Sequence, residues 1–222
     1  MCGRFYLDVK QEKLNEYFGL QSAPSIKPRY NIAPSHEILA IRSVAQNREC
    51  SFFRWGLIPF WSKDEKIGYK TINARAETVD SKPAYRAAFK YHRCLIPASG
   101  FYEWKTVDGG KQPYCLRPSK ESLFAFAGLY ERWDDKAGKE IDTCTIIVGE
   151  ANRDISPIRD RMPIIIDPAD FNAWLDPDTH DATILKPLLK PWREGEIEYH
   201  QVSMKVNSPK NDCADLILPI ST

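Results

Sequence analysis

The stretch RCLIPASGFYEW, residues 93–104, combines an apolar run with three aromatic residues. Short runs of this kind are typical of β-strands. Four further segments have the same character: HEILAIRSV (36–44), CSFFRWGLI (50–58), SLFAFAGLYERW (122–133) and CTIIVGEA (144–151). MPIIID (162–167) is a shorter buried segment. The polar residues between the segments 36–44 and 50–58 predict that these two strands form a hairpin. The sequence therefore predicts a protein made mainly of strands.

Three other segments favour helices. KQEKLNEYFG (10–19) is amphipathic and ends at Gly19, which is a common helix stop. DPADFNAWL (167–175) has an apolar face, and ATILKPLLK (182–190) is predicted as a helix that Pro187 breaks. Because strands outnumber helices and do not alternate with them, we expect an α+β fold. Its largely antiparallel, barrel-like sheet would be flanked by helices.

The length and composition are those of one ordinary globular unit. At 222 residues the chain is long for one domain and short for two, and we expect a single domain over residues 1–222. No apolar run approaches the length of a membrane span, and the chain does not start with a signal region. We therefore expect a cytoplasmic protein, nucleoid-associated if bacterial, that binds no membrane. Nothing in the sequence suggests an obligate oligomer, so a monomer is expected.

The cysteines and the net charge narrow the classes of function. The six cysteines are scattered, without a CxxC pair or a histidine at ligand spacing, which argues against a metal site and against a disulfide framework. No cofactor is expected. The formal net charge of +1 argues against a broadly basic nucleic-acid surface. A nucleic-acid site would have to be a local cluster of arginines.

The chain begins MCGRF, which places a cysteine at position 2. Aminopeptidases remove an initiator methionine when the next side chain is small. Removal of Met1 would leave Cys2 with a free α-amine and a thiol on adjacent carbons, a pair of groups that no internal cysteine offers. The alternative is that Cys2 is an ordinary small hydrophobic residue at a loosely held terminus.

Several other stretches combine arginine, aromatic residues and proline in ways that strand formation does not require. They are RYNIAP, RWGLIP, INARAET, FYEWK and DRMP, in this order over nearly the whole chain after MCGRF. Together these six motifs resemble the SRAP family. The resemblance implies an α+β fold with a barrel-like sheet. It also implies an activity in the DNA damage response: covalent crosslinking of the N-terminal cysteine to abasic sites in single-stranded DNA, which shields the lesion.

The residue chemistry agrees with that resemblance. An abasic site opens, to a small extent, into an aldehyde. An α-amine titrates near about 7.7–8.0 and a lysine amine near about 10.4, so the amine of Cys2 is the better nucleophile at cellular pH. It can form a Schiff base with the aldehyde, and the neighbouring thiol can then close a five-membered thiazolidine ring. Position 2 and the loss of Met1 are both needed for this reaction.

Two residues in the matching motifs are candidates for assisting this chemistry. Glu103 lies between Tyr102 and Trp104, and apolar neighbours can raise a carboxyl pKa toward neutrality, so Glu103 is a candidate acid and base. Asn73 can hold the cysteine or a sugar hydroxyl, because its amide both donates and accepts. The alternatives are a surface glutamate on a strand and an asparagine in a turn.

The DNA candidates are arginines and aromatic residues. Arg4, Arg75 and Arg161 are candidate phosphate ligands, because guanidinium groups match phosphate oxygens. Their alternative is solvated surface charge. Candidates for stacking on an unpaired base or touching DNA are Trp61, Phe60, Pro34 and Lys210.

The sequence departs from the family pattern at one place. Members carry a histidine in a run resembling D-x-H-D-R-x-P, and the histidine position is Arg159 here. A histidine can shuttle a proton to and from the sugar oxygen, whereas arginine stays protonated. The resemblance therefore implies a crosslink that forms but reverses slowly, unless His92 or His200 takes the same place in space.

Two other functions remain open. The protein could be a thiol autopeptidase that processes proteins with Cys2, although no histidine is firmly placed to activate a protease thiol. It could also be a non-covalent single-stranded DNA-binding module in which Cys2 is incidental. Of the three functions, only covalent capture predicts a shifted band on a denaturing gel when the protein is incubated with abasic DNA.

Overall fold

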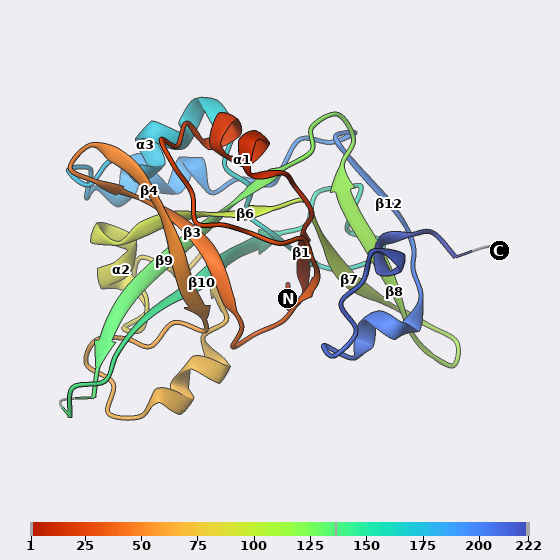
Figure 1. Cartoon of the computed structure of the whole chain (residues 1–222), viewed down its shortest axis with the longest axis horizontal. Coiled ribbons are helices and arrows are strands. Elements are labelled where there is room, and N and C mark those ends of the chain that lie inside the picture. Colours follow the sequence, from red (N-terminus) through yellow and green to blue (C-terminus); the bar gives the residue numbers. More distant parts are fainter. Residues whose placement is uncertain (1, 136, 221–222) are drawn as a thin grey trace.

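The computed structural model describes residues 2–135 and 137–220, and its largest feature is a closed ring of strands (Figure 1). β10 and β9 are each 11 residues long and pair with one another, which closes the ring. In order around the ring, the strands are β10 (Glu140–Glu150), β4 (Asn47–Trp55), β3 (Glu37–Val44), β6 (Arg93–Ala98) and β9 (Phe124–Asp134). The pairings around the ring are antiparallel except where β10 meets β4. The predicted α+β, barrel-like fold is confirmed.

A second, five-stranded antiparallel sheet lies beside the ring (Figure 1). Its strands, in order, are β12 (Ile197–Gln201), β8 (Gly110–Pro118), β7 (Gly100–Val107), β1 (Phe5–Leu7) and β2 (Arg29–Ile32). β1 lies where the two sheets meet. The aromatic ring of Phe5 lies 5.3 Å from that of Trp55 on β4 and 6.0 Å from that of Phe126 on β9. Phe5 therefore anchors the N-terminal strand to the barrel core.

The stretch 93–104 is two strands in two sheets rather than one. β6 ends at Ala98 in the ring, and β7 begins at Gly100 in the second sheet. A Cβ atom on Gly100 would lie 2.5 Å from Leu116 O and 2.5 Å from Tyr6 Cε1, so only glycine lets the chain pass between its neighbours here. This crossing carries Glu103 out of the barrel and places it beside the N-terminal strand.

Two short strands pair with the C-terminal part of β10. β5 (Asn73–Arg75) pairs parallel with one edge, and β11 (Arg161–Pro163) pairs antiparallel with the other. Val148 is opposite both Arg75 and Pro163. The INARAET and DRMP motifs, far apart in sequence, therefore flank the same strand.

The helices are short and cover the ring. They are α1 (Gln11–Phe18), α2 (Arg86–Tyr91), α3 (Phe171–Leu175) and α4 (Ala182–Leu185), and the 3₁₀ turns are Glu65–Lys70, Pro168–Asp170, Lys186–Leu188, Met204–Asn207 and Ala214–Ile217. α1 ends as predicted at Gly19, whose φ of 62° is left-handed. The predicted helix over 182–190 is α4 followed by a 3₁₀ turn with Pro187 in it, because proline cannot donate the next helical hydrogen bond.

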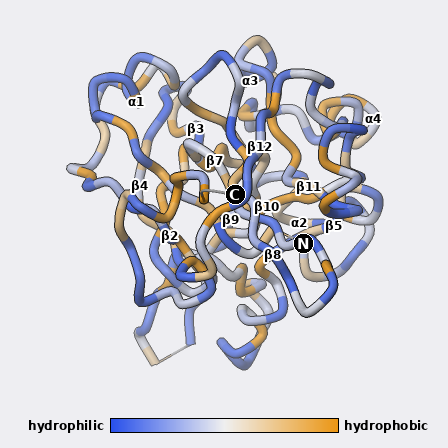
Figure 2. Tube along the Cα trace, turned by 90° about the vertical axis from the view of Figure 1, so that its right-hand side faces the viewer, coloured by the Kyte–Doolittle hydropathy of each residue, from blue (hydrophilic) through white to orange (hydrophobic). Residues whose placement is uncertain are grey.

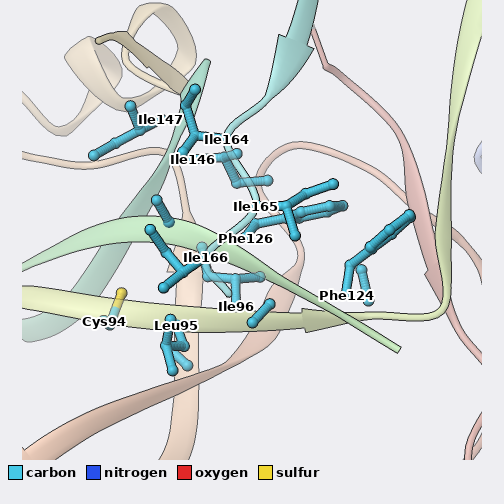
Figure 3. Packing of buried hydrophobic residues seen from close by; sticks show 14 of the residues in the cluster. Cys94, Leu95, Ile96, Phe124, Phe126, Ile146, Ile147, Ile164, Ile165 and Ile166 are labelled. Atoms are coloured by element: carbon cyan, nitrogen blue, oxygen red, sulfur yellow. The ribbon is translucent and has the colours of Figure 1, made fainter. Parts of the chain in front are cut away.

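The core fills the ring and the space under the helices. Figure 3 shows side chains of β6, β9 and β10 packed together, among them Cys94, Phe126 and Ile146. In Figure 2 hydrophilic residues dominate the outer loops, while hydrophobic stretches run through the middle of the fold. No helix among the described residues is long and apolar enough to cross a membrane.

Candidate active site where the two sheets meet

Cys2 lies in the interior, next to the strand that carries Glu103. The amide of Tyr102 donates to Arg4 O at 2.9 Å, and Phe5 pairs antiparallel with Phe101, so the residues just before Phe5 run alongside the part of β7 that follows Phe101. The Cys2 side chain is 0% exposed. Burial, and next to it the negative charge of Glu103, raises the pKa of the Cys2 thiol. The thiol is therefore protonated at neutral pH and needs a base to release its proton.

Glu103 is a buried carboxyl with a cation at its side. Its side chain is 2% exposed, and Arg159 Nε lies 3.6 Å from Glu103 Oε2. Burial raises the pKa of Glu103, and the charge of Arg159 opposes that rise without cancelling it. A carboxyl whose pKa is raised toward neutrality can both accept and return a proton in one reaction cycle. The role of Glu103 as acid and base stays a prediction.

Asn73 offers an acceptor without a partner. It is 8% exposed on β5, and its Oδ1 is buried with no hydrogen-bond partner among the described residues. Its Nδ2 is 3.5 Å from Ile146 O, at the limit of a hydrogen bond, and the Tyr85 hydroxyl donates to its backbone carbonyl at 3.0 Å. A buried, unsatisfied amide oxygen is costly unless a ligand or a water uses it. Its role in holding a sugar hydroxyl stays a prediction.

Arg4 is tied into the protein. Its Nη1 donates to Asn31 Oδ1 and to Val206 O, both at 2.7 Å, and its guanidinium carbon lies 5.9 Å from the Trp104 ring. Burial lowers the pKa of Arg4. A phosphate at Arg4 would have to share the guanidinium with these partners.

The other two candidate phosphate ligands flank β10. Arg75 is exposed, and Arg161 pairs its Nη1 with the Glu77 carboxylate. Glu77 follows β5 closely in sequence, so this acidic side chain belongs to the same motif as Arg75. Glu77 neutralises one of the two cations, a contact that the sequence did not predict.

The candidates for base contact lie at the surface. Phe60 is 62% exposed and Trp61 is 49% exposed, just beyond the end of β4, and neither packs into the core. Pro34 is half-buried near the same end of β4, where the amide of Ser35 donates to Trp55 O, and Lys210 is exposed. Their roles stay predictions.

The histidines are bonded elsewhere. His92 Nδ1 lies 2.9 Å from Glu131 Oε1, and His200 Nε2 lies 2.8 Å from Ile217 O. The side chain beside Glu103 is Arg159, the residue at the family's histidine position. Within the described parts of the chain, no group of three or more His, Cys, Asp or Glu side chains is arranged to hold a metal ion.

Sequence reasoning missed Asn31. It lies in the RYNIAP motif and is 1% exposed, and its side chain makes hydrogen bonds at both ends. Its place in the RYNIAP motif, beside the apolar residues Ile32 and Ala33, was the available signal. Met1, whose removal is predicted, lies outside the described residues.

Comparisons with known proteins agree on one family. The model of the family described as SOS response associated peptidase (SRAP) matches residues 1–209. The abasic site processing protein YoqW of Bacillus subtilis is 46% identical over 98% of this chain and 99% of its own length. The abasic site processing protein HMCES of Gallus gallus is 34% identical, with 87% of this chain and 67% of that protein covered. A crystal structure of a protein from Bacteroides thetaiotaomicron superposes with a TM-score of 0.90 at 28% identity, covering 99% of this chain and all of the other.

Proposed function

The chain belongs to the SRAP family, and we propose that it is an abasic site processing protein that binds single-stranded DNA and crosslinks its own Cys2 to the lesion. The observation that carries this proposal is the buried Cys2 beside a buried Glu103 with a raised pKa. The names of the relatives support the substrate. The six unpaired cysteines suit a reducing, cytoplasmic setting, and we propose that the protein acts there as a monomer.

The reaction needs two bond-forming steps. The α-amine of Cys2 attacks the aldehyde carbon, and loss of one water leaves a C=N bond. The thiol then adds across that bond: sulfur bonds to carbon, its proton leaves, and the nitrogen gains a proton. Because the Cys2 thiol is protonated at neutral pH, this second step requires a base close to sulfur, and Glu103 is the carboxylate whose charge acts on that thiol.

The test of the proposal is one denaturing gel. The protein is incubated with a single strand that carries one abasic site, and in parallel with the same strand undamaged. We expect a shifted band that survives denaturation only with abasic DNA. A peptidase or a non-covalent binding module would give no such band, and its absence would reject the proposal.

Arg75 and Arg161 are proposed to bind phosphate, and Glu77 to limit that binding. Arg75→Ala should weaken capture and lower the slope of log affinity against log salt by about one unit or less. Glu77→Gln should tighten binding about two- to fivefold at low salt, because it frees Arg161 from an ion pair. Binding isotherms of undamaged single strands at several salt concentrations measure both. Unchanged slopes for Arg75→Ala and Arg161→Ala would place the phosphate site elsewhere.

Arg159 is proposed to slow reversal of the crosslink. An arginine stays protonated at cellular pH and cannot pass a proton to the sugar oxygen, whereas a histidine can. Arg159→His should therefore speed release about tenfold. The measurement preforms the crosslink on labelled DNA, adds excess unlabelled abasic DNA and follows loss of the labelled band. Equal release rates for the two proteins would show that position 159 does not control reversal.

A further inference from the structure

One buried amide joins the two ends of the chain next to the candidate site. Asn31 Nδ2 lies 2.7 Å from Asn211 O, 2.9 Å from Ser208 O and 3.2 Å from Val206 O. Its Oδ1 accepts from Arg4 Nη1 at 2.7 Å. The two N–H groups of the amide are shared among three backbone carbonyls. Every polar atom of this side chain is engaged.

The same contacts reach the strand that carries Glu103. Arg4 donates to Val206 O as well as to Asn31, and its guanidinium faces the Trp104 ring. Trp104 Nε1 donates to Asn207 Oδ1 at 2.8 Å. The N-terminal strand, β7 and the segment of residues 206–212 are thus held together, with Asn31 and Arg4 between them.

The segment 206–212 depends on Asn31 because it has little regular structure of its own. Val206 ends up fully buried, but the tip of the segment, with Pro209 and Lys210, is exposed. Val206 O also accepts from Arg4 Nη1, and Ser208 O also accepts from the Asn211 amide, so Asn31 Nδ2 adds to bonds that these two carbonyls already make. At 2.7 Å its shortest bond is to Asn211 O, and a carbonyl that loses its donor on folding is costly. The Tyr30 amide, which donates to the Asp212 carboxylate, adds a second attachment to β2.

We propose that Asn31 is a positioning residue for the covalent reaction, an inference that rests on the proposed function. Its two N–H donors hold the segment 206–212, and with it Lys210, against β2. Its carbonyl oxygen holds Arg4, which is two residues from the nucleophile. The donors therefore set how well DNA is held, and the acceptor sets how fast Cys2 reacts.

The two roles can be separated with Asn31→Asp and Asn31→Ala. Aspartate keeps an acceptor for Arg4, whose charge keeps the new carboxylate ionised, but it has no proton for the three carbonyls. Alanine removes both contacts. The crosslinking rate is measured against the concentration of abasic single strand, which gives a maximal rate and a half-saturating concentration.

For Asn31→Asp we expect the half-saturating concentration to rise about threefold or more, with the maximal rate within about twofold of the original. For Asn31→Ala we expect the same rise and a maximal rate about tenfold lower, because misplacing a reacting group costs rate. Asn47→Asp, the same change on the exposed hairpin, is the matched control and should alter neither constant. If the maximal rate of both Asn31 variants falls only in proportion to their folded fraction, or if neither constant changes, the inference is wrong.

Hydrogen exchange tests the contact without DNA. In both variants the amides of residues 204–212 should exchange about tenfold faster or more, while those of β9 and β10 keep their original rates. If Asn31→Asp does not fold, Asn31→Ala carries this measurement and the kinetic one. Unchanged exchange would overturn the positioning role even in a protein that crosslinks. A wild-type protein that forms no crosslink would instead reject the proposed function, and the exchange result would still decide whether Asn31 holds the segment.

Discussion

A Cys2→Ala protein should form no crosslink that survives denaturation, a loss of at least about a hundredfold against the unchanged protein. The alanine variant keeps a free α-amine once Met1 is removed, since alanine is also small, so it can still form the C=N bond with the aldehyde. It has no thiol to close the ring, and the C=N bond hydrolyses when the protein is denatured. Adding borohydride during incubation reduces that bond and should restore the band.

Two controls separate the amine from the thiol. A version with extra residues before Cys2 keeps the thiol but has no α-amine at that carbon, and it should give no band with or without borohydride. Intact-mass measurement of the unchanged protein should show that Met1 is absent. A crosslink-competent protein that retains Met1 would contradict the aminothiol mechanism.

Glu103→Gln is the second change with a large expected effect, because it keeps the shape of the side chain and removes its titratable proton. Crosslinking should slow about a hundredfold or more, the usual range for loss of a general acid or base. Binding of undamaged single strands should persist. Glu131→Gln is the matched control: Glu131 is 3% exposed, but it pairs with His92 away from Cys2, so crosslinking should keep its rate. Equal losses of binding and crosslinking in Glu103→Gln would mean that Glu103 is structural.

The same variant makes a prediction about stability and pH. Burial raises the pKa of Glu103 in the folded protein, so the stability that this carboxyl contributes is fully present below its unfolded pKa of about 4.3. That contribution is lost as the pH rises through the raised pKa. Glutamine is neutral throughout, so Glu103→Gln should be more stable than the unchanged protein at pH 8 and nearly equal to it at pH 4. Urea unfolding at the two pH values measures this difference.

Local sequence patterns predicted the elements that form whatever their partners in the tertiary structure are. The strands of the barrel follow from apolar runs, since a buried strand needs apolar side chains wherever its partners come from. The end of α1 follows from Gly19, because a left-handed residue is easiest for glycine. The motifs, through their resemblance to a family, pointed to Cys2 and Glu103 before any geometry was known.

The three-residue strands and the outer strands of the second sheet were harder to predict. β1 and β5 are each three residues long and carry no period of their own. They form because longer strands, β7 and β10, offer them free edges. β8 and β12 contain prolines or charged residues that weaken a strand pattern. They form strands because their backbones pair with one another.

The sequence by itself determined the strand-rich composition, the helix stops and the cysteine at position 2, because each depends on residues adjacent in the chain. Only the tertiary structure decided that 93–104 divides at Ser99, so that β7 leaves the barrel and Glu103 reaches Cys2. It also decided that Asn31 bonds to Val206, Ser208 and Asn211, residues about 180 positions away. Such pairings depend on which buried donors and acceptors meet when distant strands pack, and a buried polar group must find a partner wherever the fold brings one.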